Sequence, residues 1–223
     1  MALILNIDTA TETAQVSFAR DGVVLQSLQN ESQKDHASFL QVAIQQLAKS
    51  AALKLNDVDA IAVTAGPGSY TGLRVGMSGA KGLCYALNKP LIAINTLEVL
   101  TTAAMQQNNF SKGILYCPMI DARRMEVFTV VYNYALTSVL HSCAMVLDED
   151  SFAALLQQHQ ILFFGSGAAK WQRICKHPNA SFAVVSSLIA AMANLSNTCF
   201  NKQQFANLAY SEPYYLKEFQ DKI

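Results

Sequence analysis

Two apolar runs of the same kind, each followed by aspartate, lie about half a chain apart in this 223-residue sequence. Ala2–Ile7 ends at Asp8, and Ile114–Ile120 ends at Asp121. After each run the pattern predicts further strands joined by short turns, and then helices and strands in alternation. A repeat that spans half the length predicts two related α/β lobes, each with a mixed sheet covered by helices.

The repeat also sets the expected division of the chain. We place residues 1–105 in an N-terminal lobe and residues 106–223 in a C-terminal lobe. Two placements remain open for the last helix, which either stays with its own lobe or packs back on the N-terminal one. Apolar residues at helical spacing predict two helices in the N-terminal lobe, over Asp35–Ala51 and Thr71–Leu87.

Charge is scarce in this chain. Lys and Arg total 16, Asp and Glu total 16, and charged residues make up only 14% of the sequence, against a typical ~25%. A stand-alone nucleic-acid binder needs a basic footprint, and a disordered hub needs high charge with few apolar residues, so both classes are excluded. A weakly charged surface gives little repulsion between molecules and favours association with a second copy or with a partner.

The cysteine usage and the apolar segments predict a reduced, cytoplasmic protein without a membrane span. The five cysteines lie far apart and form no CxxC pair, which is typical of free thiols rather than a disulfide framework. The first residues lack the basic segment of a signal peptide, and no uninterrupted apolar run of about 18 residues occurs.

Several residues at strand ends are candidates for a nucleotide site. An aspartate at the end of a lobe's opening strand can hold a metal-bound water or orient a phosphate, but Asp and Thr also end strands because they satisfy loop backbone groups. The turn 165–167 can receive an adenine or a ribose, or it is an ordinary glycine turn between strand and helix. The candidate cleft consists of Asp8, Thr9, Asp121, Gly165 and Gly167. No HxxxH, HExxH or Cys/His cluster is present, so no metal ligand set is predicted.

Residues Gly66–Gly76 read GPGSYTGLRVG and form the most unusual segment. A glycine-rich turn before a helix can cradle a phosphate with backbone N–H groups. This segment, however, lacks the Lys-Ser/Thr pair of a P-loop and the spacing of a dinucleotide-binding fingerprint.

The predicted helix that follows has a face of small residues. Each glycine inside a helix costs about 1 kcal/mol relative to alanine, so Gly72, Gly76, Gly79 and Gly82 call for a reason. Small residues on one face let another backbone approach closely. The approaching backbone belongs either to this protein's own sheet or to another chain, and the sequence leaves both alternatives open.

These segments together resemble a known family. The similarity to the bacterial TsaB (YeaZ) family is strong over residues 1–100 and looser afterwards, and GPGSYTGLRVG is its most specific part. Lys217 stands where the family more often has Arg. The matching segments are Ile7–Thr9, His36, Gly66–Gly76 and Pro213–Lys217.

The resemblance implies a two-lobed actin-like, Hsp70-like, sugar-kinase-like (ASKHA) fold. It also implies a role in making N6-threonylcarbamoyladenosine at position 37 of tRNAs that read codons beginning with A. In that pathway the paralogous transferase TsaD moves the threonylcarbamoyl group to adenosine, and the ATPase TsaE drives turnover. TsaB would be the non-catalytic partner that docks on TsaD through the N-terminal lobes, forms a homodimer when alone, and contacts tRNA only indirectly.

For this chain, the resemblance implies a set of interface residues, and the departures from the family's relatives imply weak nucleotide chemistry. Asp8–Thr11 lacks the glycine that follows the first aspartate in a DxGT phosphate loop, and the transferase's metal-binding histidine pair is absent. We therefore expect weak ATP hydrolysis at most and no required cofactor, with ADP or ATP in the cleft or at a subunit interface as an option. The alternatives are an ATPase or kinase of the same fold and a metallopeptidase. The expected partner interface consists of His36, Leu40, Gly72, Arg74, Val75, Gly76, Gly79 and Leu83.

Overall fold

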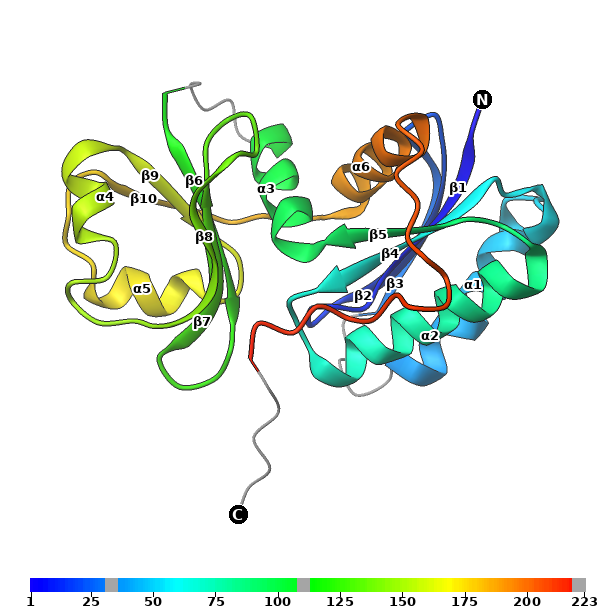
Figure 1. Cartoon of the computed structure of the whole chain (residues 1–223), viewed down its shortest axis with the longest axis horizontal. Coiled ribbons are helices and arrows are strands. Elements are labelled where there is room, and N and C mark those ends of the chain that lie inside the picture. The colour runs from blue at the N-terminus through cyan, green and yellow to red at the C-terminus, as the bar shows by residue number, and fades with distance from the viewer. Residues whose placement is uncertain (31–35, 108–112, 218–223) are drawn as a thin grey trace, which may run out of the picture. The chain divides into compact units, whose positions relative to one another are not determined.

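The computed structural model describes residues 1–30, 36–107 and 113–217. The chain forms two compact units (Figure 1). Unit 1 consists of Met1–Val99 and Ser187–Tyr214, and unit 2 of Leu100–Ser186 and Tyr215–Ile223.

Unit 1 contains a five-stranded mixed sheet in the order β3-β2-β1-β4-β5. The first three strands form an antiparallel meander, and β4 and β5 run parallel to β1. The strands are β1 (Leu3–Asp8), β2 (Ala14–Arg20), β3 (Val23–Asn30), β4 (Ala60–Gly66) and β5 (Leu91–Asn95).

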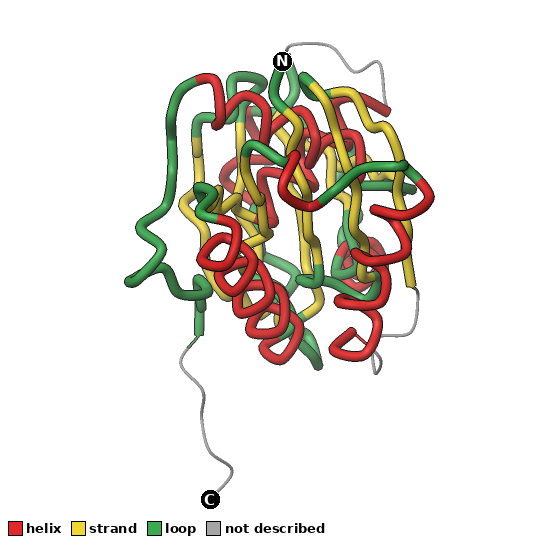
Figure 2. Tube along the Cα trace, turned by 90° about the vertical axis from the view of Figure 1, so that its right-hand side faces the viewer, coloured by secondary structure: helices red, strands yellow, loops and turns green. Residues whose placement is uncertain are grey.

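Helices lie on the sheet of unit 1, and Figure 2 shows them flanking the strands. Alternate side chains of β1 point to opposite faces, so Leu3, Leu5 and Ile7 share one core with the apolar sides of two helices. These are α1 (His36–Ser50) and α2 (Tyr70–Leu87), close to their predicted ranges, although Asp35 lies outside the described residues. A short 3₁₀ turn, η2 (Leu55–Asp57), precedes β4.

Unit 2 repeats the same topology. Its order, β10-β9-β6-β7-β8, again joins an antiparallel meander to two parallel strands. Its core includes Phe152, Phe163 and Trp171, whose rings meet edge to face. This repetition confirms the predicted pair of related α/β lobes. The elements are β6 (Leu115–Asp121), β7 (Glu126–Tyr132), β8 (Ser138–Val146), α4 (Ala153–Gln158), β9 (Ile161–Phe164), α5 (Ala168–Ile174) and β10 (Ala180–Ala183).

The division between the units differs from the predicted boundary at residue 105. It falls inside α3 (Thr96–Gln107), between Val99 and Leu100. The last helix, α6 (Ile189–Asn201), belongs to unit 1 because its buried side, with Ala193 among its residues, packs on β1, β2, β3 and β5. None of the helices in the described ranges is both long and apolar enough to cross a membrane.

The segment after α6 lies along β5 and α2. The N–H of Ala206 donates to the carbonyl of Leu91 at 2.8 Å, as in an added antiparallel strand. Lys81 Nζ then donates to two carbonyl oxygens of the segment, at 3.3 Å to Ala209 and 2.9 Å to Ser211. These contacts fix residues 206–211 on unit 1.

Candidate functional site

The first predicted site residue, Asp8, is fully enclosed at the end of β1. Its Oδ1 accepts from Thr64 Oγ1 at 2.8 Å and from the Ala10 N–H at 3.0 Å, and its Oδ2 accepts from Gln15 Nε2 at 3.1 Å. Burial raises the pKa of Asp8, although these hydrogen bonds and nearby His36 act in the opposite direction. The carboxylate therefore ties β1 to β2 and β4, and only 1% of the residue is exposed.

The glycine-rich segment covers the loop that follows Asp8. The Ser69 N–H donates to the Ala10 carbonyl at 2.7 Å, and Thr9 Oγ1 donates to the Gly72 carbonyl at 2.7 Å. A Cβ on Gly68 would collide with the Ala10 carbonyl. Thr9 and Ala10 are both 0% exposed. The chain itself thus occupies the space beside the loop in which a phosphate cradle was considered.

The small-residue face of α2 packs within unit 1. A Cβ on Gly72 would collide with the Thr9 carbonyl, and one on Gly76 with Thr9 Oγ1. A Cβ on Gly79 would lie 2.8 Å from Leu40 Cδ2 of α1. Of the two alternatives that the sequence left open, the structure provides the intrachain one, because α2 must approach the β1 loop closely.

The members of the expected partner interface differ in burial. His36, Leu40, Gly72 and Gly76 are buried in unit 1 and present little surface to another molecule. His36 is buried at the start of α1, where its Nε2 lies 3.2 Å from the Glu12 carbonyl. Their contact with a partner was implied by the family resemblance, and their small and apolar side chains also suit a tightly packed helix pair.

The outer face of α2 carries the exposed members of the expected interface. Arg74 is exposed, and Val75, Gly79 and Leu83 are half-buried. The Arg74 guanidinium lies 4.1 Å from the centre of the Tyr70 ring, a cation–π contact. Tyr85, which was not proposed as a site residue, is 84% exposed on this helix. Neither α1 nor α2 contains an Asp or Glu.

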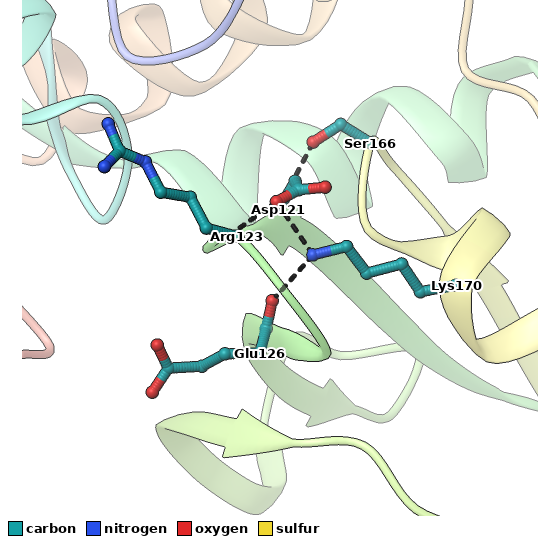
Figure 3. A network of polar contacts seen from close by, with 5 residues as sticks. All are labelled: Asp121, Arg123, Glu126, Ser166 and Lys170. Atoms are coloured by element: carbon teal, nitrogen blue, oxygen red, sulfur yellow. Dashed lines mark hydrogen bonds and ion pairs between the residues drawn. The ribbon is translucent and has the colours of Figure 1, made fainter.

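In unit 2, the predicted site residue Asp121 forms an ion pair (Figure 3). Its Oδ1 accepts from Lys170 Nζ at 2.8 Å and from the Arg123 N–H at 2.6 Å, while its own N–H donates to Ser166 Oγ at 3.0 Å. Partial burial acts to raise the pKa of Asp121, but the hydrogen bonds from Lys170 and Arg123 outweigh it, and the pKa is lowered. Lys170 also donates to the Glu126 carbonyl at 3.1 Å.

The two glycines of the 165–167 turn are required by packing on β6. Gly165 has φ +96°, which favours glycine, and a Cβ there would collide with the Met119 carbonyl. A Cβ on Gly167 would lie 2.7 Å from Val127 Cγ1. The structure thus brings Asp121 beside this turn, with the glycines in structural roles. Among the described residues, no group of three or more His, Cys, Asp and Glu side chains is placed to hold a metal ion.

Two exposed arginines of unit 2 were not among the predicted site residues. Arg123 and Arg124 lie exposed in the turn between β6 and β7, with φ values of +72° and +46°. A left-handed conformation costs an L-residue roughly 1–2 kcal/mol, and short hairpin turns with positive φ prefer Asn-Gly or Asp-Gly. The sequence signal that could have identified them is a pair of adjacent arginines, in place of Asn-Gly or Asp-Gly, between two predicted strands.

Comparisons with known proteins match the chain to the TsaD family model and to individual TsaB and YeaZ proteins. Residues 24–223 match the family described as "TsaD: tRNA N6-adenosine threonylcarbamoyltransferase". The chain is 27% identical over 221 residues to the tRNA threonylcarbamoyladenosine biosynthesis protein TsaB of Escherichia coli, covering 96% of this chain and 94% of that protein. The structure of YeaZ from Pseudomonas aeruginosa superimposes with a TM-score of 0.78 at 25% identity, over 97% of this chain and all of that one.

A more distant structure bears on the fold alone. The inorganic polyphosphate/ATP-glucomannokinase from Arthrobacter sp. strain KM has a TM-score of 0.50 at 12% identity, over 90% of this chain and 100% of that one. The sugar-kinase-like two-lobe fold expected from the sequence is thereby confirmed.

Proposed function

The chain belongs to the TsaB (YeaZ) family, within the broader TsaD group and its pathway of tRNA threonylcarbamoyladenosine synthesis, and from that premise we propose that it is the non-catalytic activating subunit of the TsaD transferase. In this role the chain binds TsaD and holds it in an active arrangement. TsaD carries out the transfer to tRNA, and TsaE joins the same complex. The chain itself needs neither a metal nor a nucleotide for this task.

The observation that carries the proposal is the covered loop of unit 1. Thr9 and Ala10 are fully buried beneath the segment 66–72, and every hydrogen bond of the Asp8 carboxylate goes to its own unit. In unit 2, the Asp121 carboxylate is paired with Lys170. Carboxylates that already accept hydrogen bonds or form ion pairs within the protein are poorly suited to bind a Mg²⁺–nucleotide complex. A binding role is therefore favoured over ATP hydrolysis.

The outer face of α1 and α2 is the proposed contact with TsaD. It contains exposed apolar and aromatic surface, with Val42 53% and Tyr85 84% exposed. It also contains Arg74 and no carboxylate. Aromatic and Arg side chains are enriched at protein interfaces. When TsaD is absent, the same face joins two copies of this chain into a homodimer.

The proposal is tested by mixing the purified chain with TsaD and TsaE and measuring both complex mass and tRNA modification. We expect a heteromeric complex and modification that depends on this chain. Arg74→Glu should weaken the complex, because it places a carboxylate on a face without one and removes the contact with Tyr70. Arg20→Glu is the matched control, since Arg20 is exposed at the end of β2.

Two results would contradict the proposal. One is full tRNA modification by TsaD and TsaE in the absence of this chain. The other is appreciable ATP turnover by the purified chain that is lost in Asp8→Asn, which would favour the ATPase or kinase alternative instead.

A further inference from the structure

The turn between β6 and β7 presents two cationic side chains to solvent. Arg123 and Arg124 are exposed, and neither forms an ion pair with any residue in the described ranges. Figure 3 shows the Arg123 side chain directed away from Asp121. Its backbone serves the local structure, because the N–H donates to the Asp121 carboxylate and the carbonyl accepts from the Glu126 N–H. The two guanidinium groups are thus not accounted for by the stability of the turn.

The backbone of this turn makes the two arginines more unusual. Both have positive φ, a conformation in which glycine or asparagine would be less strained. Residues kept in such conformations often serve a function that offsets the strain. The side chains, rather than the turn geometry, are the feature that needs an explanation.

Of the other charged residues around the turn, four form two ion pairs and one arginine adds positive charge. Asp121 is paired with Lys170 at 2.8 Å, and Glu126 with Lys217 at 2.9 Å. These pairs neutralise the two carboxylates at the ends of the turn. Arg173 is exposed on α5, three residues after Lys170 and so on the same side of that helix. The cationic cluster around the turn therefore consists of Arg123, Arg124 and Arg173, which form no ion pair with any residue in the described ranges, whereas Lys170 and Lys217 are neutralised within the two pairs.

Three acidic residues, 148–150, lie near the cluster and partly offset its positive charge. The N–H of Leu147 donates to the Met125 carbonyl, which brings the acidic run 148–150 close to the turn in space. The Asp148 carboxylate accepts from the Asp150 N–H and from Ser151 Oγ. Glu149 is exposed and has no ion pair with the described residues.

We propose that this cationic cluster binds the phosphodiester backbone of the tRNA on which the family acts. Small phosphate ligands are usually held in concave sites, whereas exposed Arg and Lys side chains on several elements are typical of contacts with the backbone of a nucleic acid. The proposal rests on the proposed function, because TsaD brings the tRNA. It replaces the expectation of indirect contact only, and it agrees with the zero net charge, since one small cluster would not bind RNA alone.

The test replaces the two arginines with the residues that the turn itself prefers. In the assembled complex with TsaD and TsaE, Arg123→Asn combined with Arg124→Gly should leave the thermal midpoint unchanged or higher. The same double variant should weaken tRNA binding roughly five- to tenfold at low salt. The slope of log affinity against log salt should decrease by about one to two units. A purely structural role of the arginines would lower the midpoint instead.

Two further variants fix the interpretation. Arg20→Gln combined with Lys202→Gln removes the same charge from exposed positions of unit 1 and should leave tRNA affinity unchanged. Glu149→Gln should strengthen tRNA binding, because it removes a negative charge beside the cluster. Binding of ATP, measured by calorimetry, should be the same in all variants, and a loss confined to ATP would assign the cluster to a free nucleotide and overturn the proposal.

The outcomes separate this inference from the proposed function. An intact complex whose tRNA affinity is unchanged in the double variant overturns the inference and leaves the activating role in place. Loss of TsaD or TsaE binding in the double variant assigns the arginines to a protein partner, which also overturns it. If the unmodified chain forms no complex with TsaD, the proposed function fails, whatever the variants do.

Discussion

The hydroxyl of Thr9 donates a 2.7 Å hydrogen bond to the carbonyl of Gly72, and it thereby fastens the loop after β1 beneath the first turn of α2. The helix can approach this closely because Gly72 and Gly76 have no side chains where Thr9 lies. The glycine-rich segment of this chain thus covers the loop that follows its own first strand. This relationship explains why the most distinctive sequence segment lies directly on the loop that follows β1.

The first prediction concerns the glycines of α2. Gly76→Leu should lower the free energy of unfolding by about 1–3 kcal/mol or more, because its Cβ would collide with Thr9 Oγ1 in a packed interior. Gly82→Ala should instead raise it by about 0.4–1 kcal/mol, since no atom lies within 4 Å of the added Cβ and alanine favours the helix. Urea denaturation measures both. Equal stability of the two variants would show that α2 does not pack on the β1 loop as described.

The sequence predicted the architecture better than it predicted the roles of individual residues. The repeat at Asp8 and Asp121 and the turn-separated strands are local signals, and they were enough to predict two related lobes. The return of α6 to unit 1 was left open because it depends on packing between segments far apart in the chain. The pairing of Asp121 with Lys170, 49 residues away, has no local signal either.

The spacing of the glycines in α2 also predicts less than the structure shows. The helical stripe of small residues showed that something approaches α2 closely, but a sequence does not state which surface does so. The position of Thr9 relative to Gly72 and Gly76 shows that the chain's own loop makes this close approach.

Asp8 and Asp121 should show opposite pH dependence. Burial raises the pKa of Asp8 above 3.8, so the folded state binds its proton more tightly than the unfolded chain. Its contribution to stability is therefore greatest at low pH and decreases as the pH rises through the folded-state pKa. For Asp121 the pKa is lowered, so its stabilising contribution is present above 3.8 and is lost as the pH falls below that value.

The measurement compares each protein with its asparagine variant across the acidic range. As the pH falls from neutral, the stability of the unmodified protein should increase relative to Asp8→Asn. Relative to Asp121→Asn it should decrease at the lowest pH values, because asparagine does not titrate. Parallel curves for the two pairs would contradict these pKa directions.

Lys81 should control how firmly the C-terminal segment is held. Its ammonium group donates to the carbonyls of Ala209 and Ser211, and Lys81→Met keeps an apolar stem while removing both hydrogen bonds. We expect faster cleavage by chymotrypsin after Tyr210, which is 83% exposed, with little change in global unfolding. Lys49→Met is the matched control at the exposed end of α1, and equal cleavage of both variants would remove Lys81 from this role.

The five cysteines should differ in reactivity according to burial. Desolvation raises the pKa of Cys84 to about 11 and raises that of Cys117 further, and both side chains are buried. Because the thiolate is the reactive form, iodoacetamide at pH 8 should modify neither residue in the folded protein. Cys143, Cys175 and Cys199 are only half-buried, so these three should be modified before Cys84 and Cys117. Peptide mass spectrometry gives the order, and early modification of Cys84 would show that α2 separates from the sheet on the time scale of labelling.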